Sequence, residues 1–298
     1  MMGKVGIILL NYCNYDLTIA CIESIKKSSY QNYEIIVIDN NSPDNSGKQL
    51  SKLDNIRFLQ MNENLGFAAG NNRGIEAAIS DGCEYVMLLN NDTVISNTMI
   101  EQLILKADEN TVVVPKMYYY DIDGKKNVIW YAGGTLKYKN SDGIHIGSRK
   151  EDSEQYSIEK KVSFATGCCM LIHKTILERV GMLREEYFMY CEDTDYSIRL
   201  NRENVKILYV PAAQLWHKVS SSSGGEMSKF IVYYVVRNKI YCAIVNKLGI
   251  KTYMYIIAET VYRTLKAKCG KYYSNYSIAP KALRHGLEKK MGRNDEEL

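Results

Sequence analysis

Two amides and a carboxylate directly follow a short apolar run at residues 85–89. The run is five apolar residues long and does not alternate with polar ones, which predicts a strand buried on both faces. Asn90, Asn91 and Asp92 then lie just past the carboxyl end of that strand, the edge where open α/β sheets bind ligands. A carboxylate there could hold a divalent metal, which would suit an anionic phosphate substrate. The same residues would also form an ordinary turn or helix cap.

A second carboxylate follows the strand predicted at residues 34–38, which is apolar from residue 35 on. Asp39 comes directly after this predicted strand, where its carboxylate could accept a hydrogen bond from a pyrimidine ring N–H. The competing interpretation is that Asp39 and Asp44 are turn and cap residues around Pro43.

Three glycines, Gly66, Gly70 and Gly74, are spaced by four residues just before a helix predicted at residues 75–79. Glycine lets the backbone approach a ligand, and amides at a helix N-terminus bind phosphate. The spacing differs from the dinucleotide-binding fingerprint, and spacing by four also favours tight helix packing.

Three carboxylates, Glu192, Asp193 and Asp195, begin a predicted amphipathic helix. Acids at a helix start are often only caps and dipole partners. However, the preceding aromatic residues 187, 188 and 190 would shield these acids from water and raise a pKa toward that of a general base. The three acids also repel one another, which a simple cap does not require.

His217 follows an apolar segment and precedes the Ser/Gly-rich residues 220–225. A lone histidine is usually structural or exposed, but beside a flexible loop it could be a metal ligand near a mobile lid. His145, His173 and His285 have no acidic or cysteine neighbours in sequence, and we assign them no role.

These residues need a scaffold, and the first hundred residues predict a parallel sheet with right-handed crossovers, because strands alternate with helices. The strands are expected at residues 5–10, 34–38, 56–60 and 85–89. Later strands are expected at 112–114, 117–120, 207–210 and 212–216, with hairpins and a flexible loop over 121–160 and a helix from residue 174. The loop at 220–225 predicts a boundary between a catalytic domain at 1–225 and a helical extension at 226–298.

Length, cysteine content and charge distribution limit the classes of protein that the chain could belong to. The 298 residues are 46% hydrophobic, enough for one large domain with an appendage. The eight cysteines form no Cys-x-x-Cys pair, which argues against a zinc knuckle, and free cysteines without a secretory signal predict a cytoplasmic protein. Residues 226–298 carry fourteen Lys or Arg against six Asp or Glu, a net +8, so the remainder carries −4 of the total +4. A basic tail favours an anionic partner.

The tail is apolar as well as basic, but Arg237, Lys239, Lys247 and Lys251 interrupt residues 230–262. No run reaches the ~18 apolar residues that a membrane span needs. The pattern predicts helices that lie on the inner face of the plasma membrane, or that pack on the catalytic body or on a second copy in a homodimer. No recognised motif accompanies the charge, so we expect no nucleic-acid partner.

Taken in order, these clusters resemble the family 2 glycosyltransferases of the GT-A fold, especially the bacterial rhamnosyltransferase-like members that build cell-surface polysaccharides. The resemblance covers about residues 4–225 and implies a Rossmann-like, mostly parallel sheet with helices on both faces, plus the C-terminal helices. It is carried by Asn11-Tyr12, residues 37–42, residues 64–72, residues 88–92, Ala165-Thr166-Gly167, residues 192–195 and Trp216-His217.

The resemblance also implies roles for individual residues. Asp39, with the loop after the first strand, would hold a uracil or thymine base. Asp92 and His217 would bind Mg²⁺ or Mn²⁺, and Asp193 would be the catalytic base with Glu192 beside it. Asn90 stands where the family's Asp-x-Asp motif has its first Asp, and an amide is a poorer ligand for a hard cation. The implied donor-binding residues are Asn11, Tyr12, Asp39, Asn64, Gly66, Gly70, Asn71 and Asn91.

The implied activity is inverting transfer of a sugar from a UDP- or dTDP-sugar, dTDP-rhamnose included, to a hydroxyl of a polysaccharide or a polyprenyl-diphosphate-linked glycan. A sugar nucleotidyltransferase would need a Gly-rich loop with Arg or Lys after the first strand, and residues 11–15 have neither. A non-catalytic nucleotide-sugar-binding subunit is the second possibility, because of Asn90.

Overall fold

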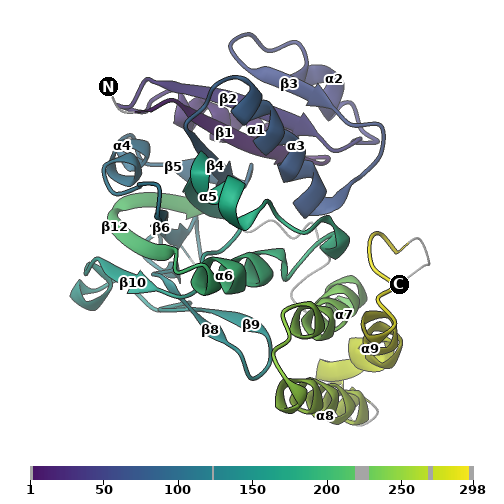
Figure 1. Ribbon diagram of the computed structural model, residues 1–298. Coiled ribbons are helices and arrows are strands. Elements are labelled where there is room, and N and C mark those ends of the chain that lie inside the picture. Colours follow the sequence, from purple (N-terminus) through teal and green to yellow (C-terminus); the bar gives the residue numbers. More distant parts are fainter. Residues whose placement is uncertain (1–2, 123, 219–227, 268–270, 295–298) are drawn as a thin grey trace.

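The computed structural model describes residues 3–122, 124–218, 228–267 and 271–294. Its first four strands form a parallel sheet in the order β3-β2-β1-β4, as the alternation of strands and helices predicts (Figure 1). The strands are β1 (Val5–Asn11), β2 (Tyr33–Asp39), β3 (Arg57–Gln60) and β4 (Tyr85–Leu89), and the helices between them are α1 (Tyr15–Ile25), α2 (Ser46–Leu50) and α3 (Gly66–Ser80).

The sheet continues beyond β4 as a mixed sheet of ten strands in the described chain. β11 (Cys169–His173) pairs antiparallel with β4 and is followed outward by β6 (Thr111–Tyr119), β12 (Lys206–His217) and β10 (Lys160–Val162). Off this path lie β5 (Thr93–Ile95) and β7 (Ile129–Tyr131), and β8 (Gly134–Lys137) pairs with β9 (Asp142–His145) in a separate hairpin. The predicted α/β class with a large central sheet is confirmed.

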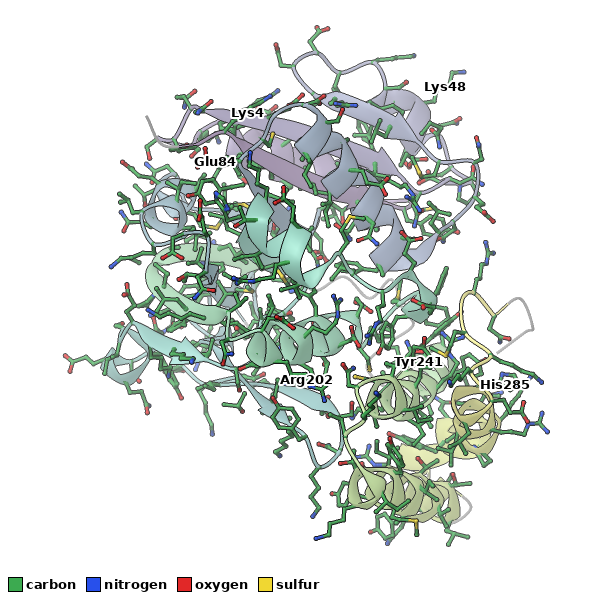
Figure 2. The ribbon with its side chains drawn as sticks, in the orientation of Figure 1. Lys4, Lys48, Glu84, Arg202, Tyr241 and His285 are labelled. Carbon is green, nitrogen blue, oxygen red and sulfur yellow. The ribbon has the colours of Figure 1, made fainter. Side chains whose placement is uncertain are left out.

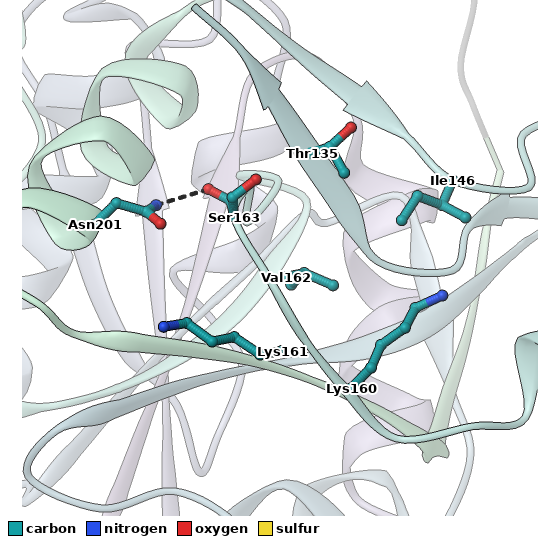
Figure 3. A pocket seen from close by; sticks show the side chains of 7 residues that line it. All are labelled: Thr135, Ile146, Lys160, Lys161, Val162, Ser163 and Asn201. Carbon is teal, nitrogen blue, oxygen red and sulfur yellow. Dashed lines mark hydrogen bonds between the residues drawn. The ribbon is translucent and has the colours of Figure 1, made fainter.

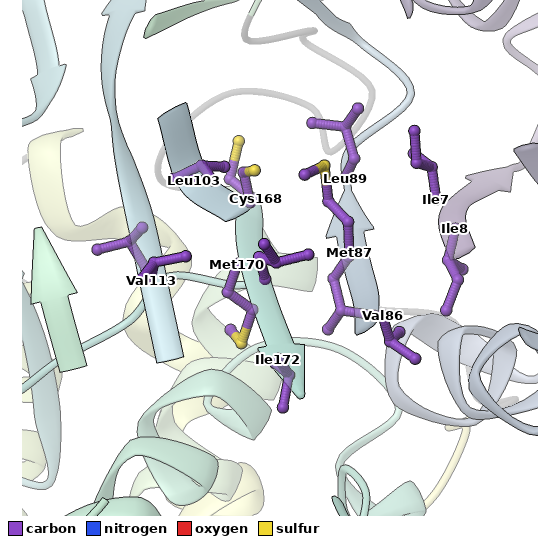
Figure 4. Close-up of a cluster of buried hydrophobic side chains, with 14 of the residues drawn as sticks. Ile7, Ile8, Val86, Met87, Leu89, Leu103, Val113, Cys168, Met170 and Ile172 are labelled. Atoms are coloured by element: carbon purple, nitrogen blue, oxygen red, sulfur yellow. The ribbon is translucent and has the colours of Figure 1, made fainter. Parts of the chain in front are cut away.

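The apolar runs of the central strands form the core. Val86, Met87 and Leu88 have no exposed surface, so β4 is buried on both faces as its uninterrupted apolar sequence predicts. Figure 4 shows side chains of β1, β4, β11 and β6 packed next to one another. At the amino ends of β1 and β4, Lys4 and Glu84 lie side by side (Figure 2), and the Glu84 amide donates to the Lys4 carbonyl at 2.9 Å. The polar clusters therefore occupy the opposite, carboxyl edge.

Two predicted strand pairs are single strands. Residues 112–114 and 117–119 belong to β6, which ends one residue before the predicted end at 120, and residues 207–210 and 212–216 belong to β12. β6 pairs with β12 through Pro115, and β12 takes up the irregularity: the register jumps from Val210↔Pro115 to Gln214↔Lys116. A bulge lets a strand continue past a proline, which cannot donate a ladder hydrogen bond.

α3 begins at Gly66, nine residues before the predicted start, so the glycines lie inside the helix. Close packing of α3 on the sheet explains why glycine occupies two of these positions. A Cβ at position 70 would lie 2.6 Å from Leu10 Cδ1, and one at position 74 would lie 2.5 Å from Ile8 Cγ2. Gly70 and Gly74 thus let α3 lie close against β1 and β2, the packing interpretation of the four-residue spacing.

The remaining helices cover the body and form a C-terminal layer beside α6 (Figure 1). None of the described helices is long and apolar enough to cross a membrane. The loop at 220–225 lies outside the described residues, so the domain boundary stays a prediction. The body contains α4 (Met99–Ile104), α5 (Lys174–Val180), α6 (Glu192–Arg202) and the short 3₁₀ helices η1 (Glu154–Tyr156) and η2 (Glu185–Tyr187). The C-terminal layer contains α7 (Lys229–Val245), α8 (Ile250–Ala267), η3 (Lys271–Ile278) and α9 (Ala279–Leu287).

Candidate active site

Asp39 is the centre of a buried polar network at the end of β2. Its Oδ1 accepts from Asn11 Nδ2 at 2.8 Å and from the Ser42 hydroxyl at 2.6 Å, and its Oδ2 accepts from the Ser42 amide and from Gln60 Nε2, both at 2.9 Å. Burial acts to raise the pKa of Asp39, but these hydrogen bonds outweigh it and hold the pKa below its ordinary value. Asp39 is 1% exposed, so a base N–H can reach its carboxylate only if one of the four donors leaves.

The network continues across the sheet edge to the end of β4. Asn11 lies opposite Asp39 in the β1–β2 register, and its Oδ1 is 2.9 Å from the Thr18 hydroxyl. That hydroxyl in turn accepts from Asn91 Nδ2 at 2.8 Å. One chain of hydrogen bonds therefore joins the ends of β2, β1 and β4 and fixes Asn91 next to Asp92.

Asp92 and His217 meet although they are 125 positions apart in sequence. β12 pairs with β5 so that His217 lies opposite Thr93, and this register brings His217 Nε2 to 3.0 Å from Asp92 Oδ1. Both side chains are buried, and Trp130 packs edge-on against the His217 ring with centroids 4.6 Å apart. Among the described residues no group of three or more His, Cys, Asp or Glu could hold a metal. An ion at this pair would need oxygens from a substrate or water, which is common for Mg²⁺ bound to phosphates.

The start of α3 differs from the prediction that its amides hold a phosphate. The Leu65 amide donates to Asn40 Oδ1 and the Gly66 amide to Asn64 Oδ1, both at 3.0 Å. The Phe67 amide donates to the Phe188 carbonyl at 2.5 Å. These three donors are already used, so they do not form a phosphate cradle in this conformation, and Asn64 acts on the protein backbone instead.

Gly66 is the glycine that the site requires. Its φ is +80°, and a Cβ there would overlap the carbonyl oxygen of Phe188. Gly82 has a similar φ of +76° with open space around it, so it is a matched control. We expect Gly82→Ala to lose about 1–2 kcal/mol, the cost of a left-handed alanine, and Gly66→Ala to lose clearly more. Urea unfolding of both variants measures the difference, and equal losses would show that the Phe188 contact is unimportant.

Asp193 and Glu192 form a second polar centre in the first turn of α6. Asp193 Oδ2 accepts from the Gly167 amide at 3.1 Å, and Oδ1 accepts from the Thr194 amide at 2.7 Å. Burial raises the pKa of Asp193 to about 6 despite these donors. Burial and the neighbouring Asp193 charge raise the pKa of Glu192 to about 8. Both pKa values are thus raised, as expected for acids shielded from water, and at neutral pH Asp193 is the ionised member while Glu192 is mostly protonated.

Asp195, the third acid, is separated from this pair by its own partners. It has no exposed surface and accepts from Arg199 Nε at 2.9 Å, Tyr187 Oη at 3.1 Å and Asn246 Nδ2 at 2.6 Å. Arg184 Nη1 adds a second ion pair at 2.5 Å. These cations relieve the repulsion among the three acids, and Asp195 anchors α6 rather than facing a ligand.

The raised pKa of Asp193 sets an expected pH dependence. A base must be ionised, so turnover should fall as the pH drops through about 6 and protonates Asp193. A fully hydrated aspartate would lose its charge only near pH ~4. The initial rate at saturating donor between pH 4.5 and 8 measures the acidic limb. A rate that stays constant down to pH ~4.5, close to the pKa of an ordinary aspartate, would show that Asp193 is not a general base with a raised pKa.

The other predicted donor residues have different environments. Tyr12 is 41% exposed. The residues after it contribute to a hollow of about 460 Å³, which is lined by Cys13, Asn14, Tyr15, Asp16, Leu17, Asp44 and Gln49. Asn71 is buried, and its Nδ2 donates to the Phe67 carbonyl at 2.8 Å within α3. Gly70 packs against β1. Contacts of these residues with a donor remain predictions, and those of Gly70 and Asn71 have a structural explanation that needs no ligand.

Sequence reasoning missed several residues that organise this edge. Asn40 bonds to the loop before α3 through both ends of its amide, Thr18 bridges Asn11 and Asn91, and Ser42 donates twice to Asp39. Asn40 and Ser42 lie in the same polar cluster as Asp39, which was a usable signal. Thr18 is inside α1 and carries no such signal.

A second hollow, of about 400 Å³, lies between β8, β10 and the far end of α6, where Asn201 donates to the Ser163 carbonyl at 2.8 Å (Figure 3). Asn201 is eight residues from Asp193, about 12 Å along a helix. This hollow is therefore separate from the candidate active site.

Solved structures define the class of fold. The chain is similar to the structure of GalNAc-T7 with UDP, GalNAc and Mn²⁺, with a TM-score of 0.63 and 13% identity, over 96% of this chain and 56% of that one. It is also similar to residues 1–349 of S. aureus TarS, with a TM-score of 0.56 and 14% identity, over 95% and 81% of the two chains. These likenesses confirm the GT-A-like fold.

Sequence comparisons then give the family. Glycosyl transferase family 2 matches residues 5–181, and the chain belongs to this family. It is 25% identical to the low-salt glycan biosynthesis hexosyltransferase Agl10 of Haloferax volcanii, over 98% of this chain and 94% of that protein. It is 23% identical to the dTDP-rhamnosyl transferase RfbF of Shigella flexneri, over 65% and 62% of the two. The protein is a glycosyltransferase.

Proposed function

We propose that the chain transfers a sugar, with inversion, from a UDP- or dTDP-sugar to a hydroxyl of a cell-surface polysaccharide or a lipid-linked glycan. The observation that carries the proposal is the hydrogen-bond chain from Asp39 to Asn91, because it joins a candidate nucleobase site to the Asp92–His217 pair at one sheet edge. A nucleoside diphosphate has a base at one end and a metal-binding group at the other, which is the chemistry that such an edge would recognise.

The residues would divide the work as follows. The hollow lined by Tyr15 and Asp44 would take the pyrimidine, while the Asp39 network orders its walls. Asp92 and His217 would hold Mg²⁺ or Mn²⁺, which supplies charge stabilisation for the leaving diphosphate when it is bound. Asp193 would take the proton from the acceptor hydroxyl as that oxygen attacks the anomeric carbon, and the protonated Glu192 would keep the pair at a single negative charge.

The donor and acceptor are proposed from the names of the relatives. A dTDP-rhamnosyl transferase and a hexosyltransferase among them support dTDP-rhamnose or a UDP-hexose as donor. The similarity to an N-acetylglucosaminyl-diphospho-decaprenol L-rhamnosyltransferase, 31% identical over 85 residues and 28% of each chain, supports a polyprenyl-diphosphate acceptor.

Release of nucleoside diphosphate tests the proposal. The purified chain is incubated with a panel of UDP- and dTDP-sugars, with Mg²⁺, with Mn²⁺ and with a chelator. We expect slow metal-dependent release of UDP or dTDP from one donor, because water can replace the acceptor. Donor binding without any release would instead identify a non-catalytic nucleotide-sugar-binding subunit.

We also propose that α8 rests on the inner face of the plasma membrane. Ile250, Met254 and Leu265 lie along one stripe of this helix and are 57–68% exposed. Exposed lysines at positions 251 and 266 flank the stripe, whereas the acidic residue of α8, Glu259, pairs with Arg263 at 2.6 Å. An apolar stripe bordered by cations fits an anionic lipid surface.

Met254→Glu with Leu265→Glu should abolish flotation with vesicles that contain anionic lipid. Ile158→Glu, at another exposed apolar residue outside α8, should float like the wild type. Sedimentation of the lipid-free protein tests whether a second copy covers this stripe instead. If the wild type does not float but forms a dimer that the α8 variant cannot form, the stripe is a dimer interface and not a membrane surface.

A further inference from the structure

The residues just before the candidate base have an unusual backbone. Phe188 has φ 61° and ψ −61°, and Tyr190 and Cys191 have φ values of 68° and 71°. The Met189 amide donates to the Tyr187 carbonyl at 2.7 Å, which closes a γ-turn around Phe188. Such conformations cost about 1–3 kcal/mol per residue and persist only where the surroundings hold them. We call residues 187–191 the strained segment.

Two buried side chains of α7 hold the strained segment. Asn238 has no exposed surface, and its Nδ2 lies 3.0, 2.7 and 2.8 Å from the carbonyl oxygens of Tyr187, Met189 and Tyr190. Arg237 is 1% exposed, donates from Nη2 to the Tyr187 carbonyl at 3.1 Å and from Nε to Asn238 Oδ1 at 2.9 Å. The second bond orients the Asn238 amide, so both of its hydrogens point at the strained segment.

The strained segment acts on both sides of the candidate active site. On one side Cys191 is left-handed and its carbonyl accepts from the Asp195 amide at 2.9 Å, so it sets where α6 begins and where Glu192 and Asp193 point. On the other side the Phe188 carbonyl accepts from the Phe67 amide at the start of α3. The Cβ-free Gly66 gives that carbonyl its space.

We propose that Arg237 and Asn238 are positioning residues that hold the strained segment in place and thereby fix the Asp193 carboxylate relative to the donor side of the site. The inference rests on the proposed function for its catalytic consequence. It makes the first C-terminal helix part of the catalytic machinery rather than an accessory to it.

A role in stability alone is the competing explanation. Burying an arginine and an asparagine is costly unless their hydrogen bonds are satisfied, and apolar side chains would fill the same space more simply. Asn238 Nδ2 and Arg237 Nη2 instead donate to backbone carbonyls of the strained segment, and Arg237 Nη1 donates to the Gly292 carbonyl at 2.7 Å. The geometry therefore indicates that the two side chains fix the backbone conformation of the strained segment.

The test uses full-length protein and Asn238→Asp, which keeps the size of the side chain and removes both donors. A displacement of about 1 Å at the base can lower turnover by about 10²-fold, and we expect a loss of that size in kcat. The Kd for UDP or dTDP should not change, because the Asp39 edge is untouched. Hydrogen–deuterium exchange over residues 187–195 should become faster. Arg237→Lys should show the same pattern more weakly and serves as the second variant if Asn238→Asp does not fold.

Thr260→Val is the matched control. Thr260 is buried on α8, and the variant loses a bond of 2.8 Å from Thr260 Oγ1 to the Ile256 carbonyl within the C-terminal layer. It should leave kcat and the exchange of residues 187–195 unchanged even if its Tm falls. Normal exchange over residues 187–195 in folded Asn238→Asp and Arg237→Lys would overturn the inference, as would losses of kcat that follow Tm equally in all three variants. A wild type that turns over no donor would refute the proposed function, and the exchange measurement would still decide whether the segment is held.

Discussion

Asp193→Asn is expected to lower sugar transfer by about 10²–10⁴-fold, the usual contribution of a general base. The amide has the size of the carboxylate, but its single oxygen can accept from only one of the Gly167 and Thr194 amides, which donate to different oxygens of Asp193. The variant therefore loses one local hydrogen bond, while the polar edge around Asp39 is unchanged, so the Kd for the donor nucleotide should match that of the wild type. Initial rates at saturating donor and acceptor, with calorimetric binding of UDP or dTDP, measure the two quantities.

Glu192→Gln is the matched control for that variant. Because burial and Asp193 keep Glu192 mostly protonated at neutral pH, a neutral amide changes its charge little. We expect a much smaller loss of turnover than for Asp193→Asn. A large loss for Glu192→Gln together with near-normal transfer by folded Asp193→Asn would reverse the assignment of the two acids.

Asp92→Asn should lower kcat/KM by about 10²-fold or more at a fixed metal concentration. Loss of residues that merely orient metal ligands typically costs 10–100-fold, and Asp92 would be a ligand itself. His217 would then be left beside a neutral amide, so excess metal should restore part of the activity. The metal concentration at half-maximal rate is the quantity to measure.

Asn90→Asp gives the opposite change at the neighbouring position. A second carboxylate adds charge to the set of oxygen ligands, which tightens binding of hard cations, so the metal concentration at half-maximal rate should fall. If the wild type and the Asp92→Asn variant each have the same rate with metal and with chelator, the reaction does not depend on a metal at this site.

The sheet and its polar edge were predictable from sequence because they depend on local patterns. Apolar runs such as residues 85–89 mark buried strands, and alternation with helices makes the first four strands parallel. The carboxyl ends of such strands meet at one edge, so Asp39 and Asp92 can be assigned to it without coordinates.

Contacts between distant residues could not be predicted in this way. Asn238 bonds to carbonyls about 50 positions earlier, and Thr18 bridges two strand ends from within a helix. The early start of α3 was also hidden, because glycines that weaken an isolated helix are favoured where the helix packs closely on a sheet. Each case is tertiary packing that overrides a local preference.

The proposed transfer reaction depends on one nucleoside diphosphate lying along the edge formed by β2, β1 and β4. A crystal structure with Mn²⁺ and UDP or dTDP, read by the anomalous signal of manganese, would show this directly. The proposal predicts an anomalous peak within coordination distance of both Asp92 and His217, with the pyrimidine in the hollow lined by Tyr15 and Asp44. A nucleotide bound elsewhere, or manganese that touches neither side chain, would contradict it.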